Sequence, residues 1–189
     1  MGKLDNKCAI ITGGASGIGL ATAQLLADEG GAVVIADINA EQGKQAEGQI
    51  NAAGGRAVFV QCNVALAADC QRAVQTAVEK FGRLDIVFNN AGIIRRTNVI
   101  GITEEDWDLV MAVNVKSIYL MSKYAIPEIA KQGGGAIVID TIEPDPAKRY
   151  KALTAEPIRV GGFSGYYSAD GIHWTRYGHD RLLTVGSEL

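Results

Sequence analysis

A glycine-rich turn near the N-terminus is the strongest chemical signal in this sequence. Residues 12–19 read TGGASGIG and join a short apolar run, residues 7–12, to a segment with apolar residues at helical spacing, residues 20–27. Glycines there let the backbone approach a pyrophosphate, and the helix N-terminus adds free N–H groups and a positive dipole end. Glycine-rich turns also occur for steric reasons alone, but the position of this turn between a strand and a helix favours phosphate binding. We expect the pyrophosphate of a dinucleotide at Gly13, Ser16, Gly17, Ile18 and Gly19.

An acidic residue at the end of the next apolar run predicts the adenosine part of the site. Asp37 follows residues 32–36 and lies 18 positions after Gly19. A carboxylate there accepts hydrogen bonds from both ribose hydroxyls and repels a 2′-phosphate. The alternative is that Asp37 caps the next helix, although Asn39 is better placed for that role. Neither the turn nor the two positions after Asp37 contain Arg or Lys, so NAD is favoured over NADP, with Ile38 in the cofactor site.

These residues require a framework of strands and helices that alternate along the chain. Their spacing predicts right-handed βαβ units and a parallel sheet. The strands are continuous apolar runs, which indicates that helices cover both faces of the sheet. The fold class is therefore α/β, a Rossmann-type doubly wound parallel sheet. Strands are predicted over residues 7–12, 32–36, 56–61, 84–88 and 136–139, and helices over residues 20–27, 40–53, 66–81 and 104–131.

The composition changes after about residue 140. Residues 140–189 hold three of the four prolines, four of the six tyrosines and both histidines. Within them, residues 165–177 carry Asp170-Gly171 between two aromatic-rich halves, which is typical of a β-hairpin with a type I′ turn. We therefore expect two parts, an NAD-binding Rossmann domain over residues 1–139 and a tail over residues 140–189 that contains a β-hairpin.

The bulk composition excludes several classes of protein. Apolar residues make up 48% and charged residues 21%, as in globular domains, and the net charge of −3 does not favour nucleic acid or anionic membranes. No apolar run reaches the roughly 18 residues of a membrane span. Three cysteines without a Cys-x-x-Cys motif argue against a disulfide framework and structural zinc, and indicate a reducing cytoplasm. His173 and His179 alone are not enough to predict a metal site.

Further motifs, taken with the glycine turn, resemble those of the short-chain dehydrogenase/reductase family. The turn has the family's TGxxxGxG form, and Asn63-Val64 matches its Asp/Asn-Val pair beside the adenine ring. Residues 89–92 read NNAG, as in the family, and Asn114 matches the helix asparagine that supports its proton relay. The resemblance covers residues 4–139. Simpler alternatives remain, because Asn89 and Asn90 tolerate tight turns and Asn114 suits a buried asparagine that satisfies backbone groups.

The resemblance implies hydride transfer between NAD and a small-molecule carbonyl or alcohol. It assigns cofactor binding to Asn63, Val64, Asn90, Ala91 and Gly92, and a catalytic supporting role to Asn114. In the family, a Ser after the fifth strand and a later Tyr-x-x-x-Lys complete the chemistry, since a phenol needs a nearby cation to act as a base at neutral pH. Here Asp140-Thr141 follows the fifth strand, and residues 142–189 contain no Tyr-x-x-x-Lys.

Three segments resemble the missing catalytic pair only in part, and the weakest is Tyr177 with Arg181, where arginine stands in place of lysine. Tyr119 and Lys123 have its spacing but precede the fifth strand, where i,i+4 packing on one helix face is the simpler interpretation. Residues 167–169 resemble the family's Tyr-Ser-Ala segment without its lysine. We therefore expect impaired or absent turnover in this chain, and the alternative function is a non-catalytic dinucleotide-binding fragment or chimera.

The tail also weakly resembles one blade of a β-propeller glycoside hydrolase, over residues 145–175. On that interpretation the tail is related to carbohydrate-binding proteins. The Rossmann sheet is then truncated after its fifth strand, which is left as an edge unless the tail hairpin covers it. An uncovered edge favours homo-oligomers or non-specific association.

Overall fold

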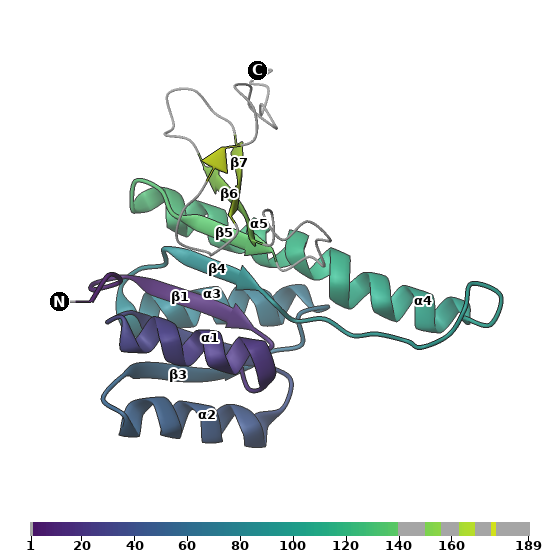
Figure 1. Ribbon diagram of the computed structural model, residues 1–189, viewed down its shortest axis with the longest axis horizontal. Helices are drawn as coiled ribbons and strands as arrows, with labels where there is room; N and C mark the ends of the chain where they lie inside the picture. Colours follow the sequence, from purple (N-terminus) through teal and green to yellow (C-terminus); the bar gives the residue numbers. More distant parts are fainter. Residues whose placement is uncertain (1, 140–149, 156–162, 169–174, 177–189) are drawn as a thin grey trace.

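Apolar runs in the first 139 residues form the five parallel strands that the sequence predicts. The structure, a computed structural model, describes residues 2–139, 150–155, 163–168 and 175–176. The parallel strands lie in the order β3-β2-β1-β4-β5 (Figure 1). Their bounds are Cys8–Thr12 for β1, Ala32–Asp37 for β2, Arg56–Gln61 for β3, Ile86–Asn89 for β4 and Ala136–Ile139 for β5. This order confirms the doubly wound α/β fold class.

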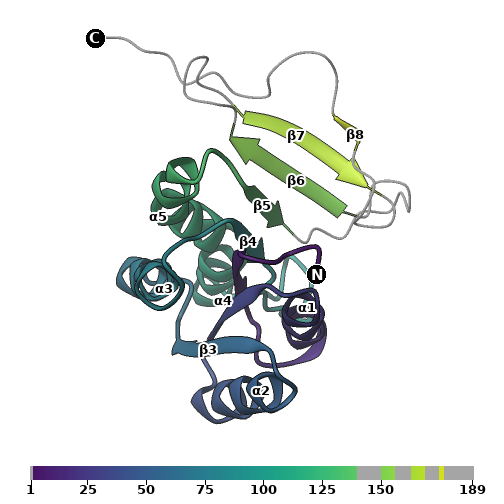
Figure 2. The same cartoon turned by 90° about the vertical axis from the view of Figure 1, so that its left-hand side faces the viewer.

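Helices connect the strands and cover both faces of the sheet, as the apolar runs predict (Figure 2). Alternate residues of β1 show the division, because Ala9 and Ile11 pack in one apolar cluster with α1 and α2, whereas Cys8 and Ile10 pack in another with α3 and α5. The helices are α1 (Gly17–Asp28), α2 (Ala40–Ala52), α3 (Ala67–Phe81), α4 (Glu104–Met111), the π-helical turn η1 (Ala112–Lys116) and α5 (Ser117–Lys131).

Three further strands extend the sheet beyond β5. They are β6 (Tyr150–Ala155), β7 (Phe163–Ser168) and β8 (Thr175–Arg176), and each pairs antiparallel with its neighbour. Of the two outcomes that the sequence left open for β5, a bare edge or an edge covered by the tail, the structure shows the second, because β6 pairs with its free side. The segment that pairs with β5 is β6 rather than the predicted hairpin. The Asp170-Gly171 turn of that hairpin lies outside the described residues, as do both histidines.

A buried carboxylate fixes the amino-terminal ends of β1 and β4. Asp85 is 2% exposed and accepts hydrogen bonds from the Cys8 backbone N–H at 2.9 Å, from Arg83 at 2.6 and 2.7 Å, and from Lys7 at 3.1 Å. Burial alone would raise the pKa of Asp85, but these hydrogen bonds and the charge of Lys7 outweigh it, so its pKa is lowered from the ordinary value. The network ties the two central strands together.

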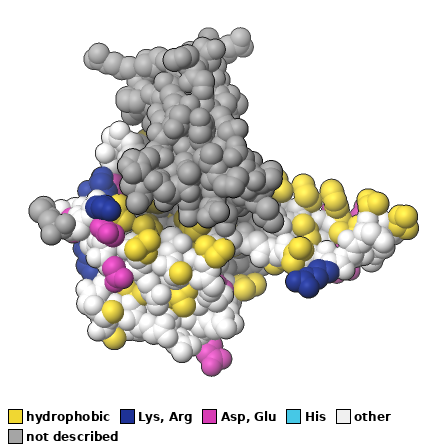
Figure 3. All heavy atoms as spheres, viewed as in Figure 1, with side chains coloured by type: hydrophobic (Ala, Val, Ile, Leu, Met, Phe, Trp, Pro, Cys, Tyr) yellow, Lys and Arg dark blue, Asp and Glu magenta, His cyan; other side chains and the backbone are white. Residues whose placement is uncertain are grey.

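The helix α4 projects from the body of the domain (Figure 1). None of its residues is buried, and hydrophobic side chains gather along it in the space-filling view (Figure 3). Exposed Trp107, Met111, Val115 and Tyr119 follow one another at intervals of four residues through α4, η1 and α5, which places them on one helix face. None of the described helices is long and apolar enough to cross a membrane.

Candidate functional site

A cavity of about 340 Å³ opens where the carboxyl ends of β1, β2, β3 and β4 meet. Ligands bind at this edge in open α/β sheets, because the loops that follow the strands converge there. The glycine turn and the NNAG segment both contribute to its lining. Its lining residues are Gly13, Ser16, Asp37, Ile38, Cys62, Asn63, Val64, Asn90, Ala91, Gly92, Ile93 and Val113.

The glycine turn leads from β1 into α1 with geometry that needs glycine. Gly13 and Gly17 have positive φ values of 63° and 53°, which side chains rarely tolerate. A Cβ at Gly19 would collide with the Gly13 carbonyl and the Asn90 side chain. Ser16 is the N-cap of α1 with extended backbone, and its side chain makes no capping hydrogen bond. The Ser16 hydroxyl is therefore not used as a cap, and the first N–H groups of α1 have no partner within the helix.

Side-chain hydrogen bonds lock the glycine turn to the end of β4. The Asn90 amide nitrogen Nδ2 donates to the carbonyl oxygens of Thr12 and Gly13 at 2.9 and 3.2 Å. In return, the Thr12 hydroxyl accepts the backbone N–H groups of Asn90 and Ala91, both at 3.0 Å. The first half of the NNAG segment therefore fixes the shape of the cavity floor between β1 and β4.

The Asp37 carboxylate is held at the end of β2, facing the cavity. Its Oδ2 accepts the backbone N–H of Ala15 at 3.0 Å, and its Oδ1 accepts that of Asn39 at 3.0 Å. Asn39, rather than Asp37, caps α2, since the Asn39 Oδ1 accepts the N–H of Gln42 at 3.1 Å. The capping alternative for Asp37 is therefore wrong, and its carboxylate instead joins the glycine turn to the second strand.

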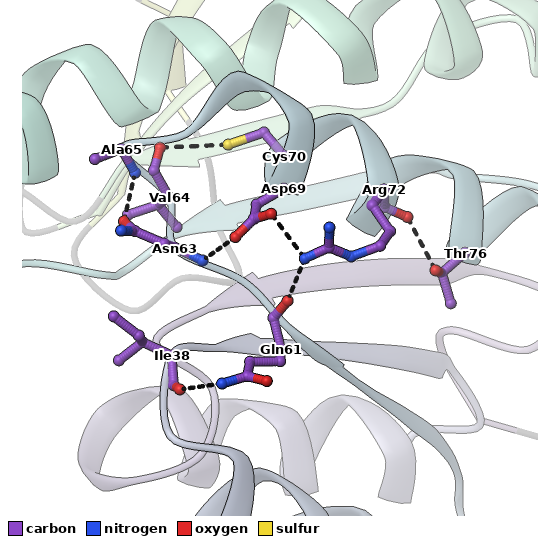
Figure 4. Close-up of polar contacts among 9 residues, drawn as sticks. All are labelled: Ile38, Gln61, Asn63, Val64, Ala65, Asp69, Cys70, Arg72 and Thr76. Atoms are coloured by element: carbon purple, nitrogen blue, oxygen red, sulfur yellow. Dashed lines mark hydrogen bonds and ion pairs between the residues drawn. The ribbon is translucent and has the colours of Figure 1, made fainter.

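Polar contacts hold the loop between β3 and α3 that carries Asn63 and Val64 (Figure 4). The Asp69 Oδ2 accepts the backbone N–H of Asn63 at 2.8 Å, and the Cys70 thiol donates to the Val64 carbonyl at 3.3 Å. Arg72 pairs with Asp69 at 2.8 Å and donates to the Gln61 carbonyl at 2.6 Å. The side chains of α3 therefore set the position of the cavity wall.

Asn114 clamps the far end of the cavity from the π-helical turn η1. Its Oδ1 accepts the backbone N–H of Ile93 and its Nδ2 donates to the Ile93 carbonyl, both at 2.8 Å. This is the role of an asparagine that satisfies backbone groups, and it orders the segment after Gly92. Such π-helical turns are frequent at functional sites.

The structure brings most of the predicted site residues together, but not all of them. Gly17 and Gly19 shape the turn without lining the cavity, Ile18 is exposed, and Asn114 acts on the lining through Ile93. Three lining residues were missed, Cys62, Ile93 and Val113. Each of the three directly adjoins a predicted residue, Asn63, Gly92 and Asn114 respectively, so its position in the chain was a signal.

The remaining candidates for chemistry lie elsewhere or are absent from the described part of the chain. Lys123 lies 5.9 Å from the ring centre of Tyr119 and 5.7 Å from that of Tyr124, which fits packing along α5. Neither Tyr119 nor Lys123 lines the cavity. Within the described residues, no three His, Cys, Asp or Glu side chains gather as metal ligands.

Comparison with known proteins places this site in a family. The family model for short chain dehydrogenases matches residues 7–141. An uncharacterised oxidoreductase of Thermotoga maritima is 48% identical over 136 residues, which are 72% of this chain and 53% of that protein. A cyclohexanol dehydrogenase of Acinetobacter is 43% identical over 168 residues, 88% of this chain and 62% of that protein. The chain thus spans little more than half the length of these relatives.

A solved structure agrees with the sequence matches. A mutant of the Serratia marcescens short-chain dehydrogenase/reductase superposes with a TM-score of 0.64 at 35% identity, over 67% of this chain and 52% of that one. The family model covers well over half of the chain, and the glycine turn, the NNAG segment and Asn114 occupy one site. The chain belongs to the short-chain dehydrogenase/reductase family and has that family's Rossmann-like fold.

Proposed function

We propose that this chain binds NAD(H), in preference to NADP(H), in the cavity at the carboxyl ends of the strands. The observation that carries the proposal is the position of the Asp37 carboxylate. It lines the cavity beside the glycine turn and is fixed by two backbone N–H groups. A carboxylate there suits a ribose with two free hydroxyls and opposes a 2′-phosphate.

The charge of the lining supports the preference for NAD. Asp37 is the only charged residue among the described residues that line the cavity, so none of these supplies a cation to a 2′-phosphate. Ile38 and Val64 provide apolar surface near Asp37, and Ile38 is 64% exposed. A flat adenine ring is a suitable partner for such surface, since it removes apolar area from water.

The glycine turn fits the pyrophosphate that such a ligand carries. Gly13 and Ser16 line the cavity, and Ser16 directly precedes the first N–H groups of α1, which have no partner within the helix. A side chain at Gly19 would close the approach between α1 and the Gly13 carbonyl. We assign Gly17, Ile18 and Gly19 to backbone contacts with the phosphates.

The nicotinamide end is assigned to the segment that Asn114 clamps. Ala91, Gly92 and Ile93 line the cavity there, together with Val113. When bound, NAD(H) supplies the hydride that is exchanged with a carbonyl or alcohol. Asn114 orders this end through Ile93, and its support of proton transfer stays a prediction.

We further propose that these 189 residues bind the dinucleotide with little or no turnover. Residues 140–189 contain no Tyr-x-x-x-Lys, and Asp140-Thr141 follow β5 where the family has serine. A tyrosine without a neighbouring cation is a poor base at neutral pH. For the whole protein we propose a small alcohol or carbonyl as substrate; similar proteins include a cyclohexanol and a cyclopentanol dehydrogenase.

Titration with NADH and NADPH tests the proposal. We expect saturable NADH binding, by fluorescence or calorimetry, and much weaker NADPH binding. Asp37→Ala should weaken NADH binding by roughly tenfold or more, because charge-assisted hydrogen bonds are lost. Asp28→Ala, at an exposed carboxylate at the end of α1, is the matched control. Equal affinity for both dinucleotides, or no effect of Asp37→Ala, would contradict the proposal.

We also propose that the exposed face of Trp107, Met111, Val115 and Tyr119 pairs with a second copy of this chain. By its spacing, Glu104 lies at one end of this face and Lys123 at the other, so an antiparallel copy places opposite charges together. Sedimentation should show a dimer that Val115→Asp converts to monomer. A monomeric parent chain at micromolar concentration would refute the pairing.

A further inference from the structure

A second cavity, of about 170 Å³, lies at the opposite end of the sheet from the first. The amino-terminal ends of β1, β2 and β3 contribute to it, whereas the first cavity lies at the carboxyl ends of the strands. Basic Lys7, Arg56 and Arg83 line this second cavity, and none of the described residues in its lining is acidic. Its apolar lining residues are Cys8, Ala32 and Phe81.

The three basic side chains carry more positive charge than the nearby Asp85 balances. Lys7 and Arg83 pair with the Asp85 carboxylate, which is 2% exposed, at 3.1 and 2.6 Å. Arg56 donates to the neutral carbonyl of Gly30 at 3.2 Å. Three positive charges therefore face one negative charge, which leaves an excess of two at this cavity.

The same side chains have more hydrogen-bond donors than these contacts use. A guanidinium has five N–H donors and an ammonium has three. Arg83 donates to Asp85 through Nε and Nη2, and Lys7 donates through one proton of Nζ. The Lys7 side chain is 45% exposed and that of Arg83 is 28% exposed. A ligand from solvent can therefore reach both cations without breaking their contacts with Asp85.

The apolar part of the lining strengthens the field of these charges. Cys8 and Ala32 are buried at the starts of β1 and β2, and Phe81 is the last residue of α3. Burial and the charge of Asp85 raise the pKa of the Cys8 thiol to about 12, so the thiol is neutral at pH 7 and adds no negative charge. Charges in a cleft with apolar walls attract an opposite ion more strongly than charges on an open surface.

We propose that this second cavity binds a small phosphate-bearing anion, either free phosphate or a phosphate ester. A phosphate dianion matches the excess of two positive charges, and guanidinium groups offer paired N–H donors that fit its oxygens. The cavity has half the volume of the first one, 170 against 340 Å³, which suits a phosphate group rather than a whole dinucleotide. This site is separate from the proposed NAD(H) site and does not rest on it.

A phosphate bound there connects the starts of three strands. Lys7 directly precedes β1, Arg56 begins β3, and Arg83 lies shortly before β4. A ligand that binds only the folded chain raises its stability as the ligand concentration exceeds the dissociation constant. Phosphate also stabilises folded proteins without a site, because it is excluded from protein surfaces, so the test must locate the bound ion.

Backbone amide NMR shifts locate the ion. Inorganic phosphate is titrated into the full chain at constant ionic strength, with acetate in a parallel titration. We expect saturable shifts at Lys7, Arg56 and Arg83 with phosphate, and much smaller shifts with acetate. Shifts confined to residues 13–19 would overturn the proposal, because phosphate would then occupy the glycine turn. Shifts that acetate reproduces, or that do not saturate, would also overturn it.

Two arginine variants test whether the charge of the cavity binds the anion. Arg56→Gln should weaken phosphate binding roughly tenfold, because a charge-assisted hydrogen bond is lost. Arg83 is not replaced, since it compensates the buried charge of Asp85. The matched control is Arg96→Gln, which removes the same charge from an exposed arginine outside both linings and should leave phosphate affinity unchanged. Equal phosphate affinity of Arg56→Gln and the parent chain would contradict the assignment.

Two further titrations separate the sources of phosphate and the two cavities. Tighter binding of inorganic phosphate than of glycerol phosphate assigns the free ion, and the reverse order assigns an ester; binding of neither refutes the site. The phosphate titration is then repeated with saturating NADH. Unchanged phosphate affinity supports a separate site, whereas competition would place the phosphate in the first cavity and overturn the proposal. If NADH does not bind, the proposed function fails, while the amide shifts still decide the phosphate site.

Discussion

The polar side chains of this site mainly hold backbone groups in place through hydrogen bonds. Asn90 holds the carbonyls of the glycine turn, Asn114 holds both polar groups of Ile93, and Asp37 holds the N–H groups of Ala15 and Asn39. Buried polar backbone must be satisfied, and asparagine can donate and accept at once. Asn90 and Asn114 therefore have a structural role that the geometry shows directly.

The glycine at position 19 provides a prediction at the residue scale. Gly19→Ala should lower the melting temperature and abolish measurable NADH binding, because its Cβ collides with the Gly13 carbonyl and the Asn90 side chain. Gly48→Ala in α2 is the matched control, because nothing lies within 4 Å of a Cβ there. It should stabilise the chain by about 0.5–1 kcal/mol. Thermal unfolding measures the stability of both variants, and titration with NADH measures their binding. A Gly19→Ala variant with unchanged melting temperature and NADH affinity would contradict the prediction and show that the turn can relax.

At the scale of elements, α3 begins without a side-chain cap and carries the loop of the cavity wall. Its N-cap is Leu66, with extended backbone and 53% exposure, and no side chain accepts the free N–H groups from that position. Asp69 instead reaches back to Asn63, before the helix. The first turn of α3 therefore has no side-chain cap, while the Asp69 carboxylate accepts a hydrogen bond from the backbone of the loop beside the cavity.

A cap introduced at position 66 should stabilise α3. Leu66→Ser is expected to raise the free energy of unfolding by about 1 kcal/mol, since a serine oxygen can accept an orphan N–H of the first turn. The reverse change, Asn39→Ala, removes the existing cap of α2 and should cost about the same. Urea unfolding of both variants provides the measurement. Destabilisation by Leu66→Ser would mean that the packing lost with the half-exposed leucine side chain outweighs the new capping hydrogen bond.

At the scale of the whole molecule, the sheet depends on Asp85 at one end and on the site residues at the other. Asp85 joins β1 to β4 through Cys8, Arg83 and Lys7, while Thr12 and Asn90 join the same strands at the cavity. Since β1 and β4 are central, both connections restrain the whole sheet. The tail strands β6, β7 and β8 continue this sheet antiparallel from β5.

The lowered pKa of Asp85 predicts how stability depends on pH. A carboxyl with a folded pKa below its unfolded value, about 3.9, contributes stability that is complete above that value and is lost as pH falls through the folded pKa. Asp85→Asn should therefore destabilise the chain at pH 7 by about 2–4 kcal/mol, and by less near pH 3. Denaturant unfolding across this pH range measures the difference, with Asp28→Asn as the exposed control. A difference that does not shrink with acid would contradict the assignment.

The sequence predicted the parallel part of the fold well, and for a clear reason. Each strand is a continuous apolar run, each helix has a periodic apolar face, and glycine or asparagine stands at most boundaries, so local preference and burial agree. The predicted helix over residues 104–131 contains the π-helical turn η1. This turn carries Asn114, whose side chain binds the backbone of Ile93, 21 residues earlier, and no local pattern encodes such a contact.

For the candidate site, the sequence by itself determined which segments take part. The glycine turn, Asp37, Asn63-Val64 and residues 90–92 each follow an apolar strand, and parallel strands bring their carboxyl ends to one edge. Only the tertiary structure decided that Val113 of the π-helical turn η1 lines the same cavity, and that β6 pairs with β5. These are packing contacts between segments far apart or on different elements, and their geometry depends on how whole helices and strands settle against one another.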